Sequence, residues 1–154
     1  SVGLGPDCVS TFDELKLKKT YSYIIYKLSD DRKTIIVDEK KTNIVDDKKT
    51  AIVDESSELT YGKFVDKLPE ADCRYAVFDF HYELDPTEGK RDKIVFVTWS
   101  PEKAPIRSKM VYASSKDTLR RALAGVGADV QGTDFSEVAY DAVLEKVAKR
   151  KSTQ

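Results

Sequence analysis

The sequence predicts an α/β (α+β) fold in which a central mixed β-sheet of roughly four to six strands is flanked by helices on both faces. Two stretches rich in aromatic and β-branched residues, 74–84 and 93–99, are the strongest strand candidates. Segments whose apolar residues recur at helical spacing lie before, between and after the strand candidates. The length of 154 residues and the 40% of hydrophobic residues favour a single domain over 1–154.

Composition narrows the function classes. Basic and acidic residues nearly cancel, with 26 Lys and Arg against 27 Asp and Glu, so we expect no nucleic-acid partner. Cys8 and Cys73 fit neither a CxxC pair nor a metal site, and both are expected to be free thiols. Residues 1–8 lack the pattern of a signal peptide, and no run of about 18 apolar residues occurs. These features predict a cytosolic protein.

A short helix is predicted after the N-terminal tip. Pro6 and Asp7 are typical of a helix start, and three apolar residues follow at helical spacing: Cys8, Phe12 and Leu15. Residues 21–28, YSYIIYKL, predict a strand that the polar residues 29–31 close with a turn. A partner strand is expected directly after this turn.

Residues 32–55 consist of one octapeptide written three times: RKTIIVDE, KKTNIVDD and KKTAIVDE. Each copy holds enough apolar residues for one brief strand. We expect the copy at 32–39 to pair with the strand at 21–28, and the later copies to form an extended excursion or an exposed loop. Residues of about 40–55 are therefore interpreted as an insertion. The acidic residues of the repeat do not fit a calcium loop, because lysines interrupt the ligand pattern.

The middle of the chain predicts a helix and two long strands. The helix has an apolar stripe that Pro69 ends: Tyr61, Phe64, Val65 and Leu68. The strand at 74–84 alternates apolar and polar residues, whereas 93–99 begins with a continuous apolar run and is expected to be central, with both faces covered. The loop between them is expected to project, with basic residues at its exit: Lys90, Arg91 and Lys93.

Residues 107–123, RSKMVYASSKDTLRRAL, predict a long helix with two different faces. One arc is expected to face the core: Val111, Tyr112, Ser115, Leu119, Ala122 and Leu123. Outside this arc, Met110 lies among four cations: Lys109, Lys116, Arg120 and Arg121. Most charged helix faces are simply solvated. A methionine exposed among cations instead favours a protein-docking surface with an adaptable apolar centre and a charged rim.

The C-terminal part predicts an edge strand and a last helix. Gly125 and Gly127 are expected to end the long helix, and 128–132 to form a short edge strand. Asp134 and Glu137 have the spacing of a capping box for the last helix. The apolar stripe of that helix is Tyr140, Val143, Leu144 and Val147.

An enzymatic function is not indicated. His81 is the only histidine, and it lies in an alternating strand where a structural role is expected. The glycines at 125 and 127 form no phosphate-binding loop. We therefore expect no catalytic residues, no metal and no cofactor.

Five segments of the chain closely resemble the actin-depolymerising factor and cofilin family, and are most similar to fungal cofilins. These segments are FDELKLKKTY at 12–21, ADCRYAVFDF at 71–80, EGKRDKIVFVTWSP at 88–101, RSKMVYASSKDTLRRAL at 107–123 and VQGTDFSEVAYDAVLEKV at 130–147. The resemblance covers nearly all residues outside the octapeptides. It implies the actin-depolymerising factor homology fold.

The resemblance also implies a function without covalent chemistry. It implies a monomer that binds actin monomers and filaments, prefers their ADP form, and severs and depolymerises filaments. The implied location is the cytoplasm at the actin cytoskeleton, with the nucleus as a second compartment. Ser1 falls where fungal relatives have the glycine that follows a regulatory serine, so the N-terminal tip is not assigned that serine.

The residues that match the family's binding surfaces form two sets. The set implied to contact both monomer and filament is Arg107, Lys109, Met110, Arg120, Arg121, Asp134 and Glu137. The filament-specific set is Arg91, Lys93, Glu145, Lys146 and Lys149. Related chains often have arginines at the positions of Lys146 and Lys149. Because lysine cannot make the bidentate contacts of arginine, some filament contacts are expected to be weaker here.

A lipid-binding module is the alternative from another class. The resemblance implies that phosphoinositide headgroups bind the basic helix and inhibit actin binding, through Lys109, Lys116, Arg120 and Arg121. The alternative function is therefore a phosphoinositide-binding module without severing activity.

Overall fold

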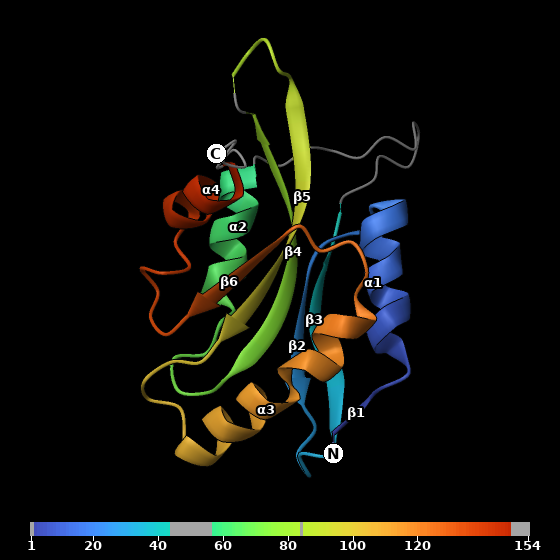
Figure 1. The fold of residues 1–154 in the computed structure, drawn as a ribbon, viewed down its shortest axis with the longest axis vertical. Coiled ribbons are helices and arrows are strands. Elements are labelled where there is room, and N and C mark those ends of the chain that lie inside the picture. The colour runs from blue at the N-terminus through green and yellow to red at the C-terminus, as the bar shows by residue number, and fades with distance from the viewer. Residues whose placement is uncertain (1, 44–56, 84, 149–154) are drawn as a thin grey trace, which may run out of the picture.

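The computed structural model describes residues 2–43, 57–83 and 85–148 (Figure 1). The elements follow in the order β1 (Gly3–Leu4), α1 (Asp7–Lys18), β2 (Tyr21–Leu28), β3 (Thr34–Thr42), α2 (Ser57–Asp66), β4 (Arg74–Glu83), β5 (Lys90–Trp99), α3 (Ile106–Ala122), β6 (Ala128–Gly132) and α4 (Tyr140–Ala148).

One mixed sheet organises these elements. Its six strands lie in the order β1-β3-β2-β4-β5-β6. The four inner strands are antiparallel to their inner neighbours, whereas β1 is parallel to β3 and β6 is parallel to β5. The predicted mixed sheet is confirmed, as is the short edge strand at 128–132.

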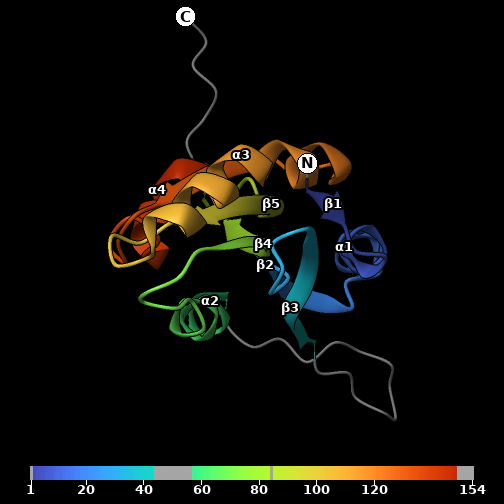
Figure 2. The same cartoon turned by 90° about the horizontal axis from the view of Figure 1, so that it is seen from below.

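Helices cover both faces of the sheet, as predicted. One buried cluster joins α1 and α3 to the sheet, and a second joins α2 and α4 to the other face. Figure 2 shows α3 and α2 on opposite sides of the central strands. Because successive side chains of a strand point to opposite faces, neighbouring residues of β4 serve different clusters. Val77 packs beneath α1 and α3, and Phe78 packs against Tyr61 of α2 with ring centroids 4.9 Å apart.

The predicted N-terminal helix is confirmed, with Cys8, Phe12 and Leu15 buried. It ends at Lys19, which adopts the left-handed conformation with φ of 57°. Cys8 and Cys73 are buried free thiols, as expected, and burial raises the pKa of both thiols.

The pattern of β4 and β5 is only partly as predicted. Residues 94–99 of β5 are buried, which confirms that both faces of this strand are covered. However, β4 is also buried on both faces from Tyr75 to Phe80, because the intervening Tyr75 and Val77 are apolar and Asp79 is buried in an ion pair with Lys19. The β5 strand starts at Lys90, so the predicted loop-exit residues Lys90 and Arg91 belong to the strand itself. The β4–β5 hairpin projects beyond the rest of the sheet (Figure 1).

The predicted start of the last helix is wrong by about one and a half turns. Asp134 Oδ1 accepts a hydrogen bond from Glu137 N (3.0 Å), as a cap would, but residues 134–138 form turns and α4 begins at Tyr140. Glu137 reaches back to Thr133 N (2.7 Å) instead of the backbone of Asp134. The pair therefore caps a turn. The apolar stripe of α4 is confirmed, with Val143 and Val147 buried.

The first octapeptide pairs as predicted. In β3, Ile35, Ile36 and Val37 lie opposite Leu28, Lys27 and Tyr26 of β2. The pairing continues into the second copy as far as Thr42, farther than expected. Strand pairing uses backbone N–H and C=O groups, which the charged residues of the second copy also have. Most of the second copy and the whole third copy fall within 44–56, which lie outside the described residues. The insertion over about 40–55 stays a prediction.

At Gly132 of β6, adding even a methyl side chain should lower the stability of the fold. A Cβ there would overlap Val138 Cγ1 and lie 3.3 Å from Trp99 Cε3, and both neighbours are buried. We expect Gly132→Ala to lower the free energy of unfolding by about 1–3 kcal/mol through overpacking, as measured by urea denaturation. Gly62→Ala on α2 is the matched control, because no atom lies within 4 Å of its Cβ position. Equal losses in both variants would contradict the overpacking argument.

Candidate functional site

The α3 helix is fixed by buried polar contacts on its inner face. Tyr112 Oη accepts a hydrogen bond from Leu28 N (2.9 Å), and Tyr75 Oη donates one to Tyr112 O (2.5 Å). Most of the predicted core arc is confirmed, because Tyr112, Ser115, Leu119 and Leu123 are buried, while Val111 and Ala122 are half-buried. This anchoring determines which side chains of α3 face outward.

The N-terminal half of α3 carries an exposed apolar pair. Met110 is 66% exposed, as predicted, and Ile106, one turn earlier, is 75% exposed. Arg107 is exposed beside them, and Lys109 Nζ donates to Glu102 O (2.8 Å). Sequence reasoning missed Ile106, although its spacing of four from Met110 places both on one helix face. The pair forms an apolar centre with a cationic rim.

The C-terminal half of α3 is tied to the sheet through Arg120. Arg120 Nε and Nη2 donate to Asp129 Oδ1 and Oδ2 (2.9 and 3.2 Å). These hydrogen bonds, with the charges of Arg120, Lys116 and Lys146, hold the pKa of Asp129 below its ordinary value. Arg121 is exposed, and its Nε donates to the backbone oxygen of Asp117 (3.3 Å). Arg120 thus has a structural role besides the predicted binding role.

The turn between β6 and α4 presents two ionised carboxylates. Asp134 Oδ1 accepts hydrogen bonds from Ser136 Oγ (2.5 Å) and Glu137 N (3.0 Å). Glu137 Oε1 accepts from Thr133 Oγ1 (2.6 Å) and Thr133 N (2.7 Å). These bonds lower the pKa of both carboxyls. Each carboxylate therefore shapes the turn and is charged at neutral pH.

Topology places this turn near the start of α3. Gly132 O accepts a hydrogen bond from Ser100 N (2.9 Å), directly before the segment that leads into α3. Phe135 in the turn is 42% exposed and packs on Trp99 with ring centroids 4.7 Å apart. The structure thus brings the predicted residues of the turn to the same end of the molecule as Met110. The N-terminal tip is close as well, because β1 contacts α3 (Figure 2).

The filament-specific residues gather at the other end of β5. Arg91 is exposed on β5, and Glu145 and Lys146 are exposed on α4. Lys93 Nζ donates to Val147 O (3.2 Å) and joins β5 to the end of α4. Lys149 lies outside the described residues. Lys93 therefore has a structural bond that the sequence did not indicate.

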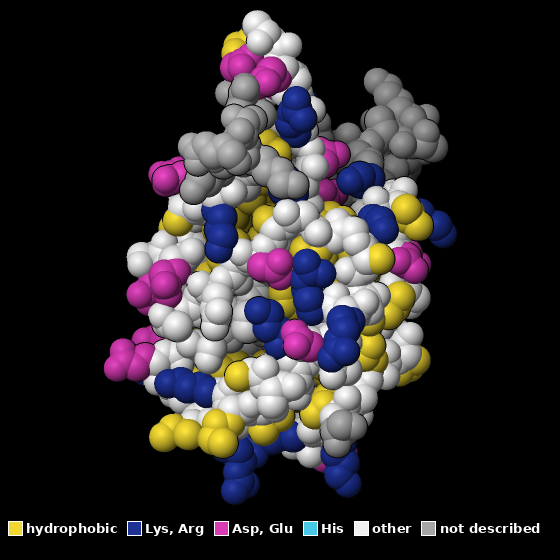
Figure 3. Space-filling model, in the orientation of Figure 1, with side chains coloured by type: hydrophobic (Ala, Val, Ile, Leu, Met, Phe, Trp, Pro, Cys, Tyr) yellow, Lys and Arg dark blue, Asp and Glu magenta, His cyan; other side chains and the backbone are white. Residues whose placement is uncertain are grey.

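The face of the molecule drawn in Figure 3 carries mixed charge, with Lys and Arg side chains and Asp and Glu between them over its middle. In Figure 1, α3 and the tip of the β4–β5 hairpin lie at opposite ends. Asp129 connects the sets electrostatically, since Arg120 of the first set and Lys146 of the second both lower its pKa.

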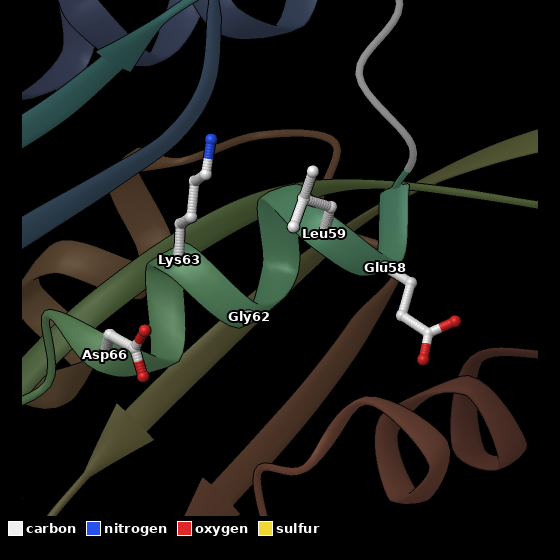
Figure 4. Close-up of a pocket in the computed structure, with 5 residues that line it drawn as sticks. All are labelled: Glu58, Leu59, Gly62, Lys63 and Asp66. Carbon is white, nitrogen blue, oxygen red and sulfur yellow. The ribbon is translucent and has the colours of Figure 1, made fainter.

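Two surface hollows lie along α2, and the second also borders the turn at 133–139 through Phe135. Figure 4 shows the first, in which Gly62 leaves a gap between larger side chains; it is lined by Glu58, Leu59, Gly62, Lys63 and Asp66. The second is lined by Val65, Asp66, Leu68 and Phe135. Neither contains a residue of the predicted binding sets.

The described residues contain neither a metal site nor a membrane span. Among residues 2–43, 57–83 and 85–148, no group of three or more His, Cys, Asp and Glu residues is arranged to hold a metal ion. Within the same ranges, no helix is long and apolar enough to cross a membrane. His81 Nδ1 lies 2.5 Å from Asp92 Oδ1 on the exposed part of the hairpin.

Known proteins match this chain over nearly its whole length. The family described as "Cofilin/tropomyosin-type actin-binding protein" matches residues 1–148. Cofilin of Kluyveromyces lactis is 55% identical over 96% of this chain and 93% of the relative, and cofilin of Schizosaccharomyces pombe is 49% identical over 97% and 96%. The crystal structure of Streptomyces griseoflavus cofilin is 44% identical, with a TM-score of 0.79 over 96% of this chain and 97% of that chain. Plasmodium berghei actin depolymerization factor 2 is 27% identical, with a TM-score of 0.81 over 97% and 98%.

The exposed apolar pair and the cationic rim of α3 are typical of a protein-binding surface. With the matches above, the chain belongs to the cofilin and actin-depolymerising factor family. The predicted homology fold is confirmed. Actin binding and actin depolymerisation follow from membership of this family.

Proposed function

We propose that the outer face of α3 binds both the actin monomer and the filament, and that the turn at 133–139 lies at the edge of this interface. The exposed pair of Ile106 and Met110 carries the proposal, because exposed apolar side chains with a charged rim are typical of docking surfaces. The proposed residues of this surface are Arg107, Lys109, Met110, Arg120, Arg121, Asp134 and Glu137.

Filament severing and a preference for ADP-actin are parts of the same proposal. They are tested with filaments and monomers prepared in the ADP and ATP forms, by microscopy of severing and by fluorescence titration. We expect tighter binding to the ADP form and severing along filament sides. Absence of binding to either actin form at low salt would contradict the proposal.

We further propose that the chain acts as a monomer at the actin cytoskeleton, in the cytoplasm and also in the nucleus.

A second surface is proposed to contact only the filament. It comprises Arg91, Lys93, Glu145, Lys146 and Lys149. Arg91 and Lys146 support this best, since both are exposed cations from different elements at the hairpin end. Lys93 is less available, because its amino group already donates to the end of α4.

Reversing Arg91 and Lys146 to glutamate should separate the two surfaces. We expect filament affinity to fall by about tenfold or more while monomer affinity stays within about twofold, since surface charges that contact only one partner weaken only that complex. Filament co-sedimentation and monomer titration measure the two affinities. Lys18→Glu, at an exposed cation of α1, is the control for charge reversal at a position outside both sets. Parallel losses for monomer and filament would contradict the two-surface scheme.

Phosphoinositide headgroups are proposed as inhibitors that bind the basic residues of α3: Lys109, Lys116, Arg120 and Arg121. Flotation with phosphoinositide vesicles, compared with vesicles of uncharged lipid, measures this binding. Addition of the same vesicles to filaments should reduce co-sedimentation of the chain. Vesicle binding without severing of filaments would favour the alternative of a lipid-binding module.

A further inference from the structure

Arg120 is held from two sides. Its guanidinium makes two hydrogen bonds to the carboxylate of Asp129, and its Cζ lies 6.0 Å from the ring centroid of Phe96. Phe96 and Asp129 are paired residues of β5 and β6, so both come from the sheet surface beneath α3. A planar guanidinium fixed by a carboxylate and an aromatic ring has a defined orientation.

The contact leaves Arg120 able to bind a partner. Its side chain is 31% exposed. Arginine has five N–H donors, and Asp129 takes one from Nε and one from Nη2, which leaves three. The neighbouring Arg121 has only a 3.3 Å bond to a backbone oxygen of its own helix. The structure thus presents one oriented and one less constrained arginine side by side.

Asp129 also faces further cations. Lys116 on α3 and Lys146 on α4 both act on its carboxylate in addition to Arg120. Asp129 is in direct contact with Arg120, while Lys116 and Lys146 act on it through their charges only, and its side chain is 48% exposed. Removing the negative charge of Asp129 would leave Arg120 without its ion-pair partner. Multiply charged anions would then be attracted more strongly.

We propose that Asp129 is a positioning residue for actin binding: it holds Arg120 in the orientation that actin contacts, and it limits the affinity of Arg120 for polyphosphorylated headgroups. The inference rests on the proposed actin-binding function of α3. Asp129 belongs to none of the predicted binding sets. Asp129 lies on the edge strand β6, nine residues after Arg120 and outside the helical spacing of α3, so that spacing gave no indication of this role.

The test uses the whole chain with Asp129→Asn, which keeps the shape of the side chain but removes its charge. We expect the affinity for the actin monomer to fall by about two- to tenfold, since an arginine without its partner must be ordered on binding. Binding to phosphoinositide vesicles should instead become stronger. Asp129→Glu should restore actin affinity at least in part. Asp13→Asn, at an exposed acid of α1, is the control for net charge.

A double-mutant cycle distinguishes positioning from general stabilisation. In an Arg120→Ala background, Asp129→Asn should no longer change actin affinity, because the side chain that it positions is absent. An equal loss in that background, or unchanged or increased actin affinity of the single variant, would overturn the inference. If the wild-type chain binds no actin, the proposed function fails with it. If the wild-type chain binds and Asp129→Asn binds equally well, only the positioning role fails.

Discussion

Replacing Arg120 and Arg121 together by glutamate is expected to abolish binding to both actin forms, with affinities lowered by about 100-fold or more. Both residues lie in the last turn of α3, next to the junction with β6. The double change replaces two positive charges by two negative ones at the proposed interface. Monomer titration and filament co-sedimentation should therefore show the same loss, unlike the variant with Arg91 and Lys146 reversed.

Controls for this variant follow from the Asp129 contact. A glutamate at 120 would stand beside Asp129 and repel it, so part of any loss could come from a displaced helix end. Arg121→Glu alone keeps the Arg120–Asp129 pair, and we expect it to lower both affinities by about tenfold without a change in thermal unfolding. A folded double variant that binds actin like the wild type would refute the assignment of these arginines.

A large effect on stability is expected at Lys19. Asp79 is 3% exposed on β4, and its Oδ2 accepts a hydrogen bond from Lys19 Nζ (2.9 Å). Asp79 Oδ1 is buried without a hydrogen-bond partner, so Lys19 is the main compensation for this charge. We expect Lys19→Met to lower the free energy of unfolding by about 2 kcal/mol, at the low end for a buried pair because Lys19 is 37% exposed.

The pH dependence of this pair has a defined sign. Burial by itself lowers the pKa of Lys19, but the hydrogen bond and charge of Asp79, together with Asp92, outweigh burial and raise it above 10.5. The stabilisation is therefore present at neutral pH and is lost as the pH rises through the folded-state pKa. Urea unfolding at neutral pH measures the effect, with Lys18→Met as an exposed neighbouring control. If Lys19→Met and Lys18→Met change the free energy of unfolding equally, Lys19 does not stabilise the buried carboxylate of Asp79.

Much of the proposed site was visible in the sequence of α3. The spacing of Tyr112, Ser115 and Leu119 determined the buried face, and this placed Met110 outside as observed. The same periodicity extended by one residue would have included Ile106. It was missed because the predicted helix began at 107, and helix ends are the least certain part of a periodic pattern.

At Asp134 and Glu137, by contrast, the sequence pattern predicted the wrong local structure. The spacing of Asp134 and Glu137 predicted a capping box, but the same two residues instead hold a turn, and α4 starts later. The spacing of a capping pair indicates which local hydrogen bonds can form. It does not indicate whether the residues that follow continue as a helix.

Apart from the two-residue strand β1, the sequence by itself determined the order of helices and strands and the apolar face of each helix, because these depend on residue spacing along the chain. The five matching segments determined the family. Only the tertiary structure decided which charges compensate one another: Lys19 with Asp79, Lys93 with the end of α4, and Arg120 with Asp129. The first pair is 60 residues apart in the sequence, and the second contact spans 54. Such contacts arise when the sheet brings distant elements side by side, and no local pattern encodes which cation meets which acceptor.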